Sequence, residues 1–426
     1  MSNYIDYVKW RGDLSFDKVE MNEVDITMFS MFPLIDLSSA LSSDEVETLK
    51  EVYEEYVSTG KRKESLGLII PDEVVDLLEV CAHSERFSSV LFKDYVRTID
   101  KYNVSQFAAL TAETDKVRII AFSGTDDTVV GWEENFTMMT RRSVPAQRLA
   151  IDYLASKIKN DKINYVIGHS KGGNLAMYSY VHSEKGIKDL IKQVYSLDGP
   201  GSMFEDWSDK TDGKIIEIVP QDATIGRVFN HYGKFKVVHS IHKGINQHDA
   251  FSWQVDKDGY VLDSETKECE IVERTMRELI CSLDENQRLD FVDSITRILR
   301  YAQAHTLTEL DKNKSYLLKA YLAENPTRRK FFTQVMLKLF SVKEVRVCIW
   351  TGMRENQKRH EEEKRRAIRE INVEKKRSLA SKTAEKKMQI KEKTARIKIF
   401  ADKTKDGADK NKETDKLEKT NENITQ

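Results

Sequence analysis

The stretch of sequence that points most directly to chemistry is a single serine between glycines, Gly168-His169-Ser170-Lys171-Gly172. The apolar segment INYVIGHS precedes this serine, and the helix-like segment KGGNLAMYSYVHSE follows it. In such a strand–turn–helix context, Gly-x-Ser-x-Gly forms a nucleophile elbow, because a serine on a strained turn needs small neighbours. A serine that only caps a helix is the alternative, but two flanking glycines exceed what capping needs. We therefore expect Gly168 and Gly172 to frame a catalytic nucleophile, Ser170.

A serine hydroxyl needs a base to become a strong nucleophile, and the base needs an acid that orients it. In α/β-hydrolases the acid and then the histidine follow the serine along the chain. Two aspartates stand directly after later strand-like segments, Asp198 after QVYSL and Asp222 after IIEIVP. The candidate bases come later still, and they are His231, His239, His242 and His248. The loop HKGINQHDAFSW ends the α/β region, where the catalytic histidine is expected.

The negative oxygen of a tetrahedral intermediate needs about two hydrogen-bond donors. The residue after the nucleophile is Lys171, and its backbone N–H is the first candidate. The second donor should lie in a loop after an earlier strand, and RIIAFSGTDDT provides a strand that ends in Ser123-Gly124-Thr125. The segment after Gly131, WEENFTMMTRRS, occupies the position of a lid but mixes polar and apolar residues.

The order of elements favours an α/β-hydrolase fold, with a mainly parallel sheet between helices. Strand-like and helix-like segments alternate from residue 104, and the runs IIAF, YVI and IIEIV are typical of strands covered on both faces. We expect a helical N-terminal part over 1–103 packed on a hydrolase core over 104–268. A helical extension over 269–350 and a charged helical or disordered tail over 351–426 complete the predicted organisation.

Charge is unevenly distributed along the 426 residues, although the net charge is only −2. Residues 351–426 hold 23 Lys and Arg against 15 Asp and Glu, so the remainder of the chain is acidic. A basic tail on an acidic body suggests contact with a protein partner or an anionic membrane surface, and no nucleic acid is expected. The apolar positions of the tail hold no regular heptad, so we expect a solvated helix or a weak coiled coil there.

The four cysteines are scattered and form no C-x-x-C pair, so neither a metal site, a redox motif nor a disulfide framework is predicted. The N-terminus has no apolar signal-peptide core, and no apolar run reaches the ~18 residues that a membrane span requires. These observations favour a cytoplasmic protein with reduced thiols and no cofactor.

Several segments resemble the class 3, or fungal-type, lipases. IIAFSGTDDTVVGWEENF is similar to their oxyanion segment, GHSKGG resembles GHSLGG, and YSLDGPG matches a strand that ends in a Gly-x-Pro turn. A narrower resemblance, to a bacterial family of lipase-like α/β-hydrolases defined by sequence rather than by a known substrate, covers roughly residues 1–260. The segments that carry it are YVKWRGDLSF, NEVD, FSGTDDT, GHSKGGNLA, SLDGPG, VPQDATIG and NQHDAFSW.

The resemblance implies Ser170 as nucleophile, Asp222 as acid, His248 as base and Thr125 as oxyanion donor beside Lys171. It implies a serine hydrolase that cleaves a carboxylic ester of a small acyl or lipid substrate. Two departures weigh against triglycerides: Lys171 places a cation where lipases often carry an apolar residue, and the lid segment is not strongly amphipathic.

A second hypothesis is an inactive scaffold that keeps the hydrolase fold and binds a partner or a membrane surface through its C-terminal helices.

Overall fold

The computed structural model describes residues 2–351 apart from 64, 302, 313 and 349, together with 354, 365 and 387. The chain divides into two units, Met1–Glu355 and Asn356–Gln426. The expected solvated helix, coiled coil and disordered end of the tail lie almost entirely outside the described residues.

An eight-stranded sheet forms the centre of the first unit, with its strands in sequential order from β1 to β8. The strands are β1 (Val46–Thr48), β2 (Leu91–Asp100), β3 (Ser105–Glu113), β4 (Val117–Phe122), β5 (Ile163–His169), β6 (Ile191–Leu197), β7 (Ile215–Pro220) and β8 (Lys234–Val238). The pairs from β1 to β4 are antiparallel, and those from β4 to β8 are parallel. The carboxyl ends of β4–β8 therefore meet at one edge, where α/β folds bind ligands.

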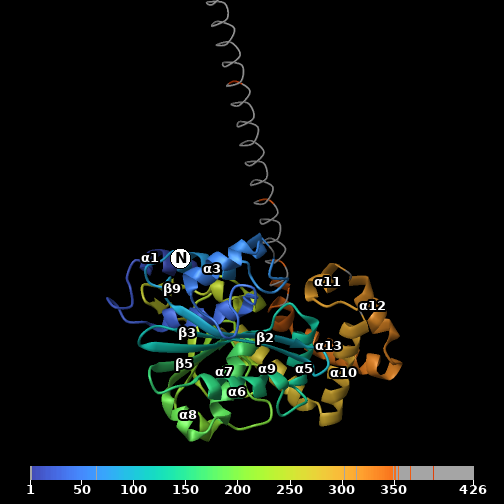
Figure 1. The fold of residues 1–426 in the computed structure, drawn as a ribbon. Coiled ribbons are helices and arrows are strands. Elements are labelled where there is room, and N and C mark those ends of the chain that lie inside the picture. The colour runs from blue at the N-terminus through green and yellow to red at the C-terminus, as the bar shows by residue number, and fades with distance from the viewer. Residues whose placement is uncertain are drawn as a thin grey trace, which may run out of the picture. The chain divides into compact units, whose positions relative to one another are not determined.

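Helices cover both faces of the sheet (Figure 1). The N-terminal helices are α1 (Tyr4–Arg11), α2 (Glu23–Thr27), α3 (Leu49–Ser58) and α4 (Glu73–Ala82). The helices between β4 and β6 are α5 (Val129–Thr137), α6 (Pro145–Lys157), α7 (Lys171–His182) and α8 (Lys185–Leu190). A short hairpin, β9 (Val255–Asp256) with β10 (Gly259–Tyr260), follows the sheet.

Two separate hydrophobic cores follow from the alternation of side chains along each strand. In β4, Ile119 and Ala121 pack into the core beneath the N-terminal helices, whereas Ile120 and Phe122 pack into the core against α6 and α7. Strands buried on both faces explain the continuous apolar runs in the sequence. The α/β-hydrolase fold expected from those runs is confirmed.

The sheet begins earlier than predicted, because β2 lies inside the segment expected to be helical. The pairing of β2 with β3 shifts register between Lys93 and Val96, and Asp94 adopts a positive φ of 55° there. The bulge leaves the buried residues Phe92 and Tyr95 three positions apart, a spacing typical of a helix. The N-terminal part expected to be helical over 1–103 therefore contains two strands of the sheet, β1 and β2.

A buried ion pair between Arg86 and Asp25 holds the N-terminal part together. Both side chains are fully buried, and the Arg86 Nε atom lies 3.0 Å from Asp25 Oδ1. The guanidinium also donates to the carbonyls of Leu14 (2.7 Å), Val19 and Glu20 (both 3.0 Å), so its donors are satisfied by three loop carbonyls and one carboxylate. Tyr7 Oη donates to the same carboxylate at 2.7 Å. Such a pair is costly to break from one side, because the remaining charge stays buried.

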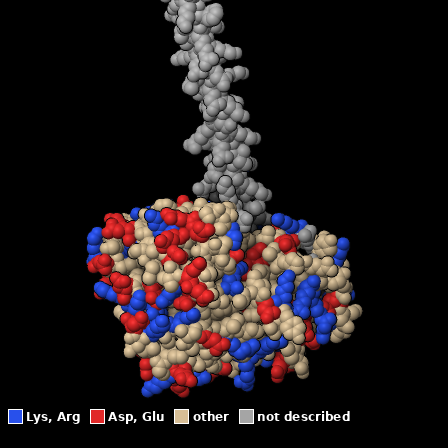
Figure 2. Space-filling model, in the orientation of Figure 1, with Lys and Arg blue, Asp and Glu red and all other residues tan. Residues whose placement is uncertain are grey.

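Five further helices extend the chain beyond the sheet. They are α9 (Lys267–Ser282), α10 (Glu285–Tyr301), α11 (Leu307–Lys312), α12 (Lys314–Ala323) and α13 (Pro326–Ser341). Helices α10–α13 gather at one end of the sheet (Figure 1). Basic and acidic side chains are mixed over the visible face of the body, with a group of basic ones over α12 and α13 (Figure 2). Among the described helices, none combines the length and apolar character needed to cross a bilayer.

We predict that Asp25→Ala lowers the free energy of unfolding by about 3–5 kcal/mol, because Arg86 is left as an unpaired buried charge. Urea denaturation followed by circular dichroism measures this loss. The control is Glu85→Ala, which removes a 3.0 Å ion pair with Lys18 between side chains that are more than half exposed, and should cost at most about 1 kcal/mol. Equal losses in the two variants would contradict the structural role of the buried pair.

Candidate active site

Ser170 occupies a sharp turn between β5 and α7. Its backbone has φ 58° and ψ −128°, a conformation that non-glycine residues rarely adopt. The Ser170 N–H donates to the carbonyl of Leu197 at the end of β6, at 2.8 Å, and this bond helps to hold the strained turn. A serine on such a turn at the carboxyl edge of a parallel sheet has the geometry of a nucleophile elbow.

The glycines around Ser170 are required by close packing of α7 on the sheet. A β-carbon on Gly168 would overlap the carbonyl of Gly172, and one on Gly172 would overlap the carbonyl of Phe122. A β-carbon on Gly173 would come within 3.1 Å of the Gly199 Cα atom. The small residues therefore let the first turn of α7 lie directly against the ends of three strands.

His248 pairs with Asp198, and not with Asp222 as the family resemblance implied. The His248 Nδ1 atom lies 2.6 Å from Asp198 Oδ2 in a fully buried carboxylate. The other carboxylate oxygen accepts the N–H of Gly226 at 3.0 Å. A carboxylate can only accept here, so the proton resides on Nδ1 and the lone pair on Nε2 is available for proton transfer. Asp198, the alternative that sequence reasoning left open, is thus the carboxylate in contact with His248.

Asp222 has a different set of contacts, which support the loop that carries His248. Its Oδ2 atom accepts the side-chain amide of Gln247 at 2.8 Å, and its N–H donates to Gln247 Oε1 at 2.9 Å. Its Oδ1 atom accepts the hydroxyl of Thr266, the N-cap of α9. The expectation that Asp222 orients the imidazole is not met, because Asp222 is bound to the residue before His248 rather than to His248 itself.

His169 acts as a neutral support for His248. Its Nε2–H donates to the His248 carbonyl at 2.8 Å, and the centroids of the two imidazole rings lie 4.6 Å apart. Burial, together with the nearby His248, lowers the pKa of His169 to about 3. His169 therefore binds a proton more readily in the unfolded chain than in the folded one. Its contribution to the free energy of unfolding decreases as the pH drops from 6.5 towards about 3.

The remaining histidine candidates contact other groups. His231 places its Nδ1 atom 2.5 Å from Glu217 and its Nε2 atom 3.1 Å from the Val228 carbonyl, so both ring nitrogens are occupied. His239 lies 2.7 Å from Asp263 on an exposed surface, and His242 contacts the backbone of its own loop. Only His248, among the four candidates, is paired with an aspartate that follows β6 or β7.

The two predicted oxyanion segments meet at Ser170. Strands β4 and β5 are parallel neighbours with Phe122 opposite Gly168, so the loop after β4 reaches the nucleophile. A β-carbon on Gly124 would lie 3.4 Å from the Ser170 Cβ atom. Thr125 follows Gly124, is largely buried, and accepts a 2.7 Å hydrogen bond from Asn135 through its hydroxyl. Lys171 is the first residue of α7, and N–H groups in the first turn of a helix have no partner within the helix.

The side chain of Lys171 is buried rather than presented to the active site. Its Nζ atom donates to the carbonyl of Gln106 at 2.7 Å and lies 3.1 Å from Glu134 Oε2. Glu134 also accepts the N–H groups of Gln106, at 3.0 Å, and Ala146, at 2.9 Å. The expected cation beside the elbow is thus neutralised inside the protein, beneath the oxyanion segment.

The predicted lid segment, residues 132–143, covers the second half of α5 and most of the connection to α6, and α5 is held in place from both sides. On one side, Glu134 belongs to the buried network with Lys171. On the other side, Glu133 pairs with Arg300 of α10, and the Arg300 Nε atom lies 3.1 Å from the Glu133 Oε2 atom. This helix is fixed by buried carboxylates, in contrast to a lid that exposes an apolar face when it opens.

Asp127 joins the oxyanion segment to two distant parts of the chain. One carboxylate oxygen accepts the N–H of Leu68 at 3.0 Å, the other accepts the N–H of Thr308 at 3.2 Å, and the backbone carbonyl accepts the N–H of Leu307 at 2.8 Å. The C-terminal extension therefore contacts the loop after β4 directly. The far end of this extension contacts the loop after β7, where the Thr224 Oγ1 atom lies 3.5 Å from the Cys348 Sγ atom.

Sequence reasoning missed the roles of Asp127, Glu134 and Gln247. The doubled aspartate in FSGTDDT was a visible signal for Asp127, but its partners come from parts of the chain 59 and 181 positions away. Within the described residues, no group of three or more His, Cys, Asp or Glu side chains is arranged to hold a metal ion.

Comparisons with known proteins give one family. The family model described as Mbeg1-like matches residues 81–297, which include every candidate catalytic residue. The structure is similar to that of M37 lipase, with 12% identity, a TM-score of 0.30 and coverage of 50% of this chain and 71% of that one. It is also similar to Lip2 lipase from Yarrowia lipolytica, with 12% identity, a TM-score of 0.29 and coverage of 44% and 75%. No curated protein matches the sequence.

We predict that Gly172→Ala destabilises the protein by at least about 1–3 kcal/mol, because its β-carbon would force α7 away from the Phe122 carbonyl. Thermal unfolding measures the effect. The control is Gly186→Ala in α8, where an added β-carbon meets nothing within 4 Å and should stabilise the helix by up to about 1 kcal/mol. A Gly172 variant as stable as the wild type would show that the close approach is not required.

Proposed function

The chain belongs to the Mbeg1-like family, and we propose that it is a serine hydrolase that cleaves a carboxylic ester in the manner of a lipase or esterase. The observation that carries the proposal is the 2.6 Å contact between His248 and the buried Asp198, next to the strained turn of Ser170. His248 and Ser170 are linked through His169, which donates to the His248 carbonyl and precedes the serine. The three side chains thus come from adjacent loops at one edge of the sheet.

In the proposed first step, the Ser170 Oγ atom attacks the ester carbonyl while the His248 Nε2 atom takes the hydroxyl proton. Asp198 keeps the histidine in the required tautomer and stabilises the imidazolium that forms, without itself becoming protonated. The imidazolium then gives its proton to the leaving alcohol, and the C–O bond of the ester breaks. The product of this step is an acyl-enzyme on Ser170.

In the second step, His248 removes a proton from water, and the resulting hydroxide attacks the acyl-enzyme. The acid is released, and the proton returns to Ser170. The backbone N–H groups of Lys171 and Thr125 are the proposed donors to the oxyanion in both steps. Their positions are supported by the contact of Gly124 with the serine turn and by the place of Lys171 at the start of α7.

We propose a small acyl or lipid ester as substrate, rather than an emulsified triglyceride. Helix α5, which stands at the lid position, is held by the pairs Glu133–Arg300 and Glu134–Lys171. Because the Glu134–Lys171 pair is fully buried, swinging this helix open would leave Lys171 as an unpaired buried charge and would be costly. A substrate that enters without such an opening fits the site better.

The alternative of an inactive scaffold does not account for the buried Asp198. A fully buried carboxylate is costly unless it is paired, and the histidine that it pairs with is in contact with His169, the residue before Ser170. A scaffold that retained only the fold would gain nothing from this arrangement. The proposal of a working hydrolase therefore explains more of the structure.

We predict that Ser170→Ala lowers the turnover of p-nitrophenyl butyrate by on the order of 10⁴–10⁶ and abolishes labelling by a fluorophosphonate probe, because the nucleophile is removed. Thermal unfolding should show a folded protein, since alanine is smaller than serine. The control is Ser183→Ala just beyond the end of α7, which should label like the wild type. Equal turnover in wild type and Ser170→Ala would exclude Ser170 from the mechanism.

We also predict that Asp198→Asn lowers kcat by about 10⁴, because an amide no longer selects the correct histidine tautomer. Asp222→Asn is the matched comparison, with the same change of side chain one strand further along the sheet. It should lower kcat less than tenfold and act mainly on stability, since Asp222 contacts Gln247 and Thr266. Steady-state kinetics on both variants test the assignment, and the reverse ranking would make Asp222 the acid.

A further inference from the structure

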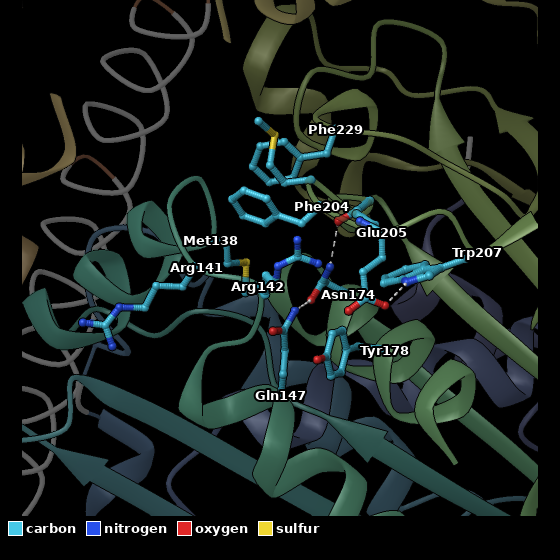
Figure 3. A pocket seen from close by; sticks show the side chains of 13 residues that line it. Met138, Arg141, Arg142, Gln147, Asn174, Tyr178, Phe204, Glu205, Trp207 and Phe229 are labelled. Carbon is cyan, nitrogen blue, oxygen red and sulfur yellow. Dashed lines mark hydrogen bonds between the residues drawn. The ribbon is translucent and has the colours of Figure 1, made fainter. Parts of the chain in front are cut away.

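A pocket lies beside the candidate active site, between the loop after β6, the segment that joins α5 to α6, and the first turns of α6 and α7 (Figure 3). Its lining includes Met138, Arg142, Gln147, Asn174, Phe204 and Phe229. The lining therefore combines apolar side chains with polar and charged ones, and the guanidinium of Arg142 is directed inward. The mechanism proposed above uses none of these side chains.

The pocket is close to the nucleophile along two elements. Asn174 is four residues after Ser170 on α7, which is about 6 Å along a helix, and its N–H bonds to the Ser170 carbonyl at 3.4 Å. On the opposite wall, Gly201 is three residues after Asp198. A group bound in the pocket would therefore lie within reach of an ester bond held at Ser170.

The floor of the pocket is held by hydrogen bonds between the side-chain amides of Asn174 and Gln147 and nearby carbonyl and N–H groups. The Asn174 side chain donates to the carbonyls of Pro200, at 3.0 Å, and Gly201, at 2.9 Å, and accepts from Gln147 at 2.8 Å. Gln147 in turn accepts the N–H of Val144 at 2.9 Å. Both side-chain N–H groups of Asn174 are thus occupied, and Arg142 is the charged donor in the pocket for an anionic group.

Arg142 has no carboxylate within ion-pair distance among the residues that the structure describes. Figure 3 shows its guanidinium directed between Phe204 and Asn174, whereas the neighbouring Arg141 points away from the other lining residues. The carboxylate of the pocket, Glu205, already accepts from Trp207 at 3.3 Å and lies 3.7 Å from Lys210. Arg142 is exposed to solvent, so its cation is free to take up an anionic group, while Met138, Phe204 and Phe229 offer apolar contacts beside it.

Phe229 is held over the pocket in a strained conformation. Its φ is 75°, an unusual value for a bulky residue, and the loop that carries it is tied down on both sides. The carbonyl of Val228 accepts from Gly201 at 2.9 Å, and Asn230 exchanges two backbone hydrogen bonds with Ser202. Strain that the surroundings enforce is characteristic of ligand sites.

We propose that this pocket binds the anionic part of an amphiphilic acyl ester, with the Arg142 guanidinium as the donor to a phosphate or carboxylate group. The inference rests on the proposed hydrolase function and specifies its substrate class. Bidentate donation from a planar guanidinium would fix the oxyanion, while Phe204 and Phe229 contact the adjoining hydrocarbon. The ester bond would then lie over the first turn of α7, next to Ser170.

Binding to the intact protein tests the pocket without requiring catalysis. Isothermal titration calorimetry with hexyl phosphate, hexanoate, hexan-1-ol and inorganic phosphate separates the contributions of charge and hydrocarbon. Hexyl phosphate or hexanoate should bind at least tenfold more tightly than hexanol and than inorganic phosphate. The tighter of the two anions identifies the chemistry of the charged group. Equal binding of the anions and hexanol would overturn the proposal.

The matched variants are Arg142→Gln and Arg141→Gln, which remove the same charge from adjacent positions. Arg142→Gln should weaken binding of the alkyl anion at least tenfold, and Arg141→Gln should change it less than twofold. Equal weakening in both would show diffuse attraction to surface charge and would also overturn the proposal. Thermal unfolding of each variant verifies that the fold is intact.

A kinetic experiment then connects the pocket with the proposed reaction. The substrates are p-nitrophenyl butyrate, which is neutral, and the mono-p-nitrophenyl ester of glutaric acid, which carries a carboxylate. Arg142→Gln should lower the ratio of kcat/KM for the anionic over the neutral ester at least tenfold, whereas Arg141→Gln should leave the ratio unchanged. An unchanged ratio in Arg142→Gln would separate the pocket from the active site. A protein that binds the anions but hydrolyses neither ester would instead contradict the proposed function alone.

Discussion

The close approach of α7 to the sheet is the constraint on which the candidate active site depends. Gly168, Gly172 and Gly173 leave no room for a β-carbon, so the helix starts directly at the ends of β4, β5 and β6. That approach forces Ser170 into its strained turn and brings the first N–H groups of α7 beside it. It also places the loop after β6, with Asp198, within hydrogen-bonding distance of the loop that carries His248.

The side chain of Lys171 is buried beneath this turn, where it forms part of a polar network instead of apolar packing. Glu134 accepts from the Lys171 ammonium and from the N–H groups of Gln106 and Ala146, and it thereby connects α5, α6, α7 and β3. Fully satisfied networks of this kind rigidify a core, whereas a single missing partner would be costly. The same carboxylate explains why α5 is held in place.

The C-terminal extension adds a second layer of support. Asp127 receives hydrogen bonds from Leu68 and Thr308, so residues far apart in the sequence hold the loop after β4 between them. Asp222 joins the histidine loop, through Gln247, to the start of α9 through Thr266. The part of the chain that follows the hydrolase sheet is therefore tied to the loops that form the site.

The sequence by itself determined the fold class and the strand–turn–helix context of Ser170, because periodicity and glycine spacing are local properties. Chain order left four histidines as candidate bases, and the family resemblance singled out His248. The sequence left Asp198 and Asp222 as alternatives, since both follow a parallel strand and only the path of the loops decides which one reaches the imidazole. It could not reveal the bulge in β2, where a local kink produces helical spacing. Nor could it reveal that Lys171 turns inward to Glu134, because that pair joins residues 37 positions apart that only packing brings together.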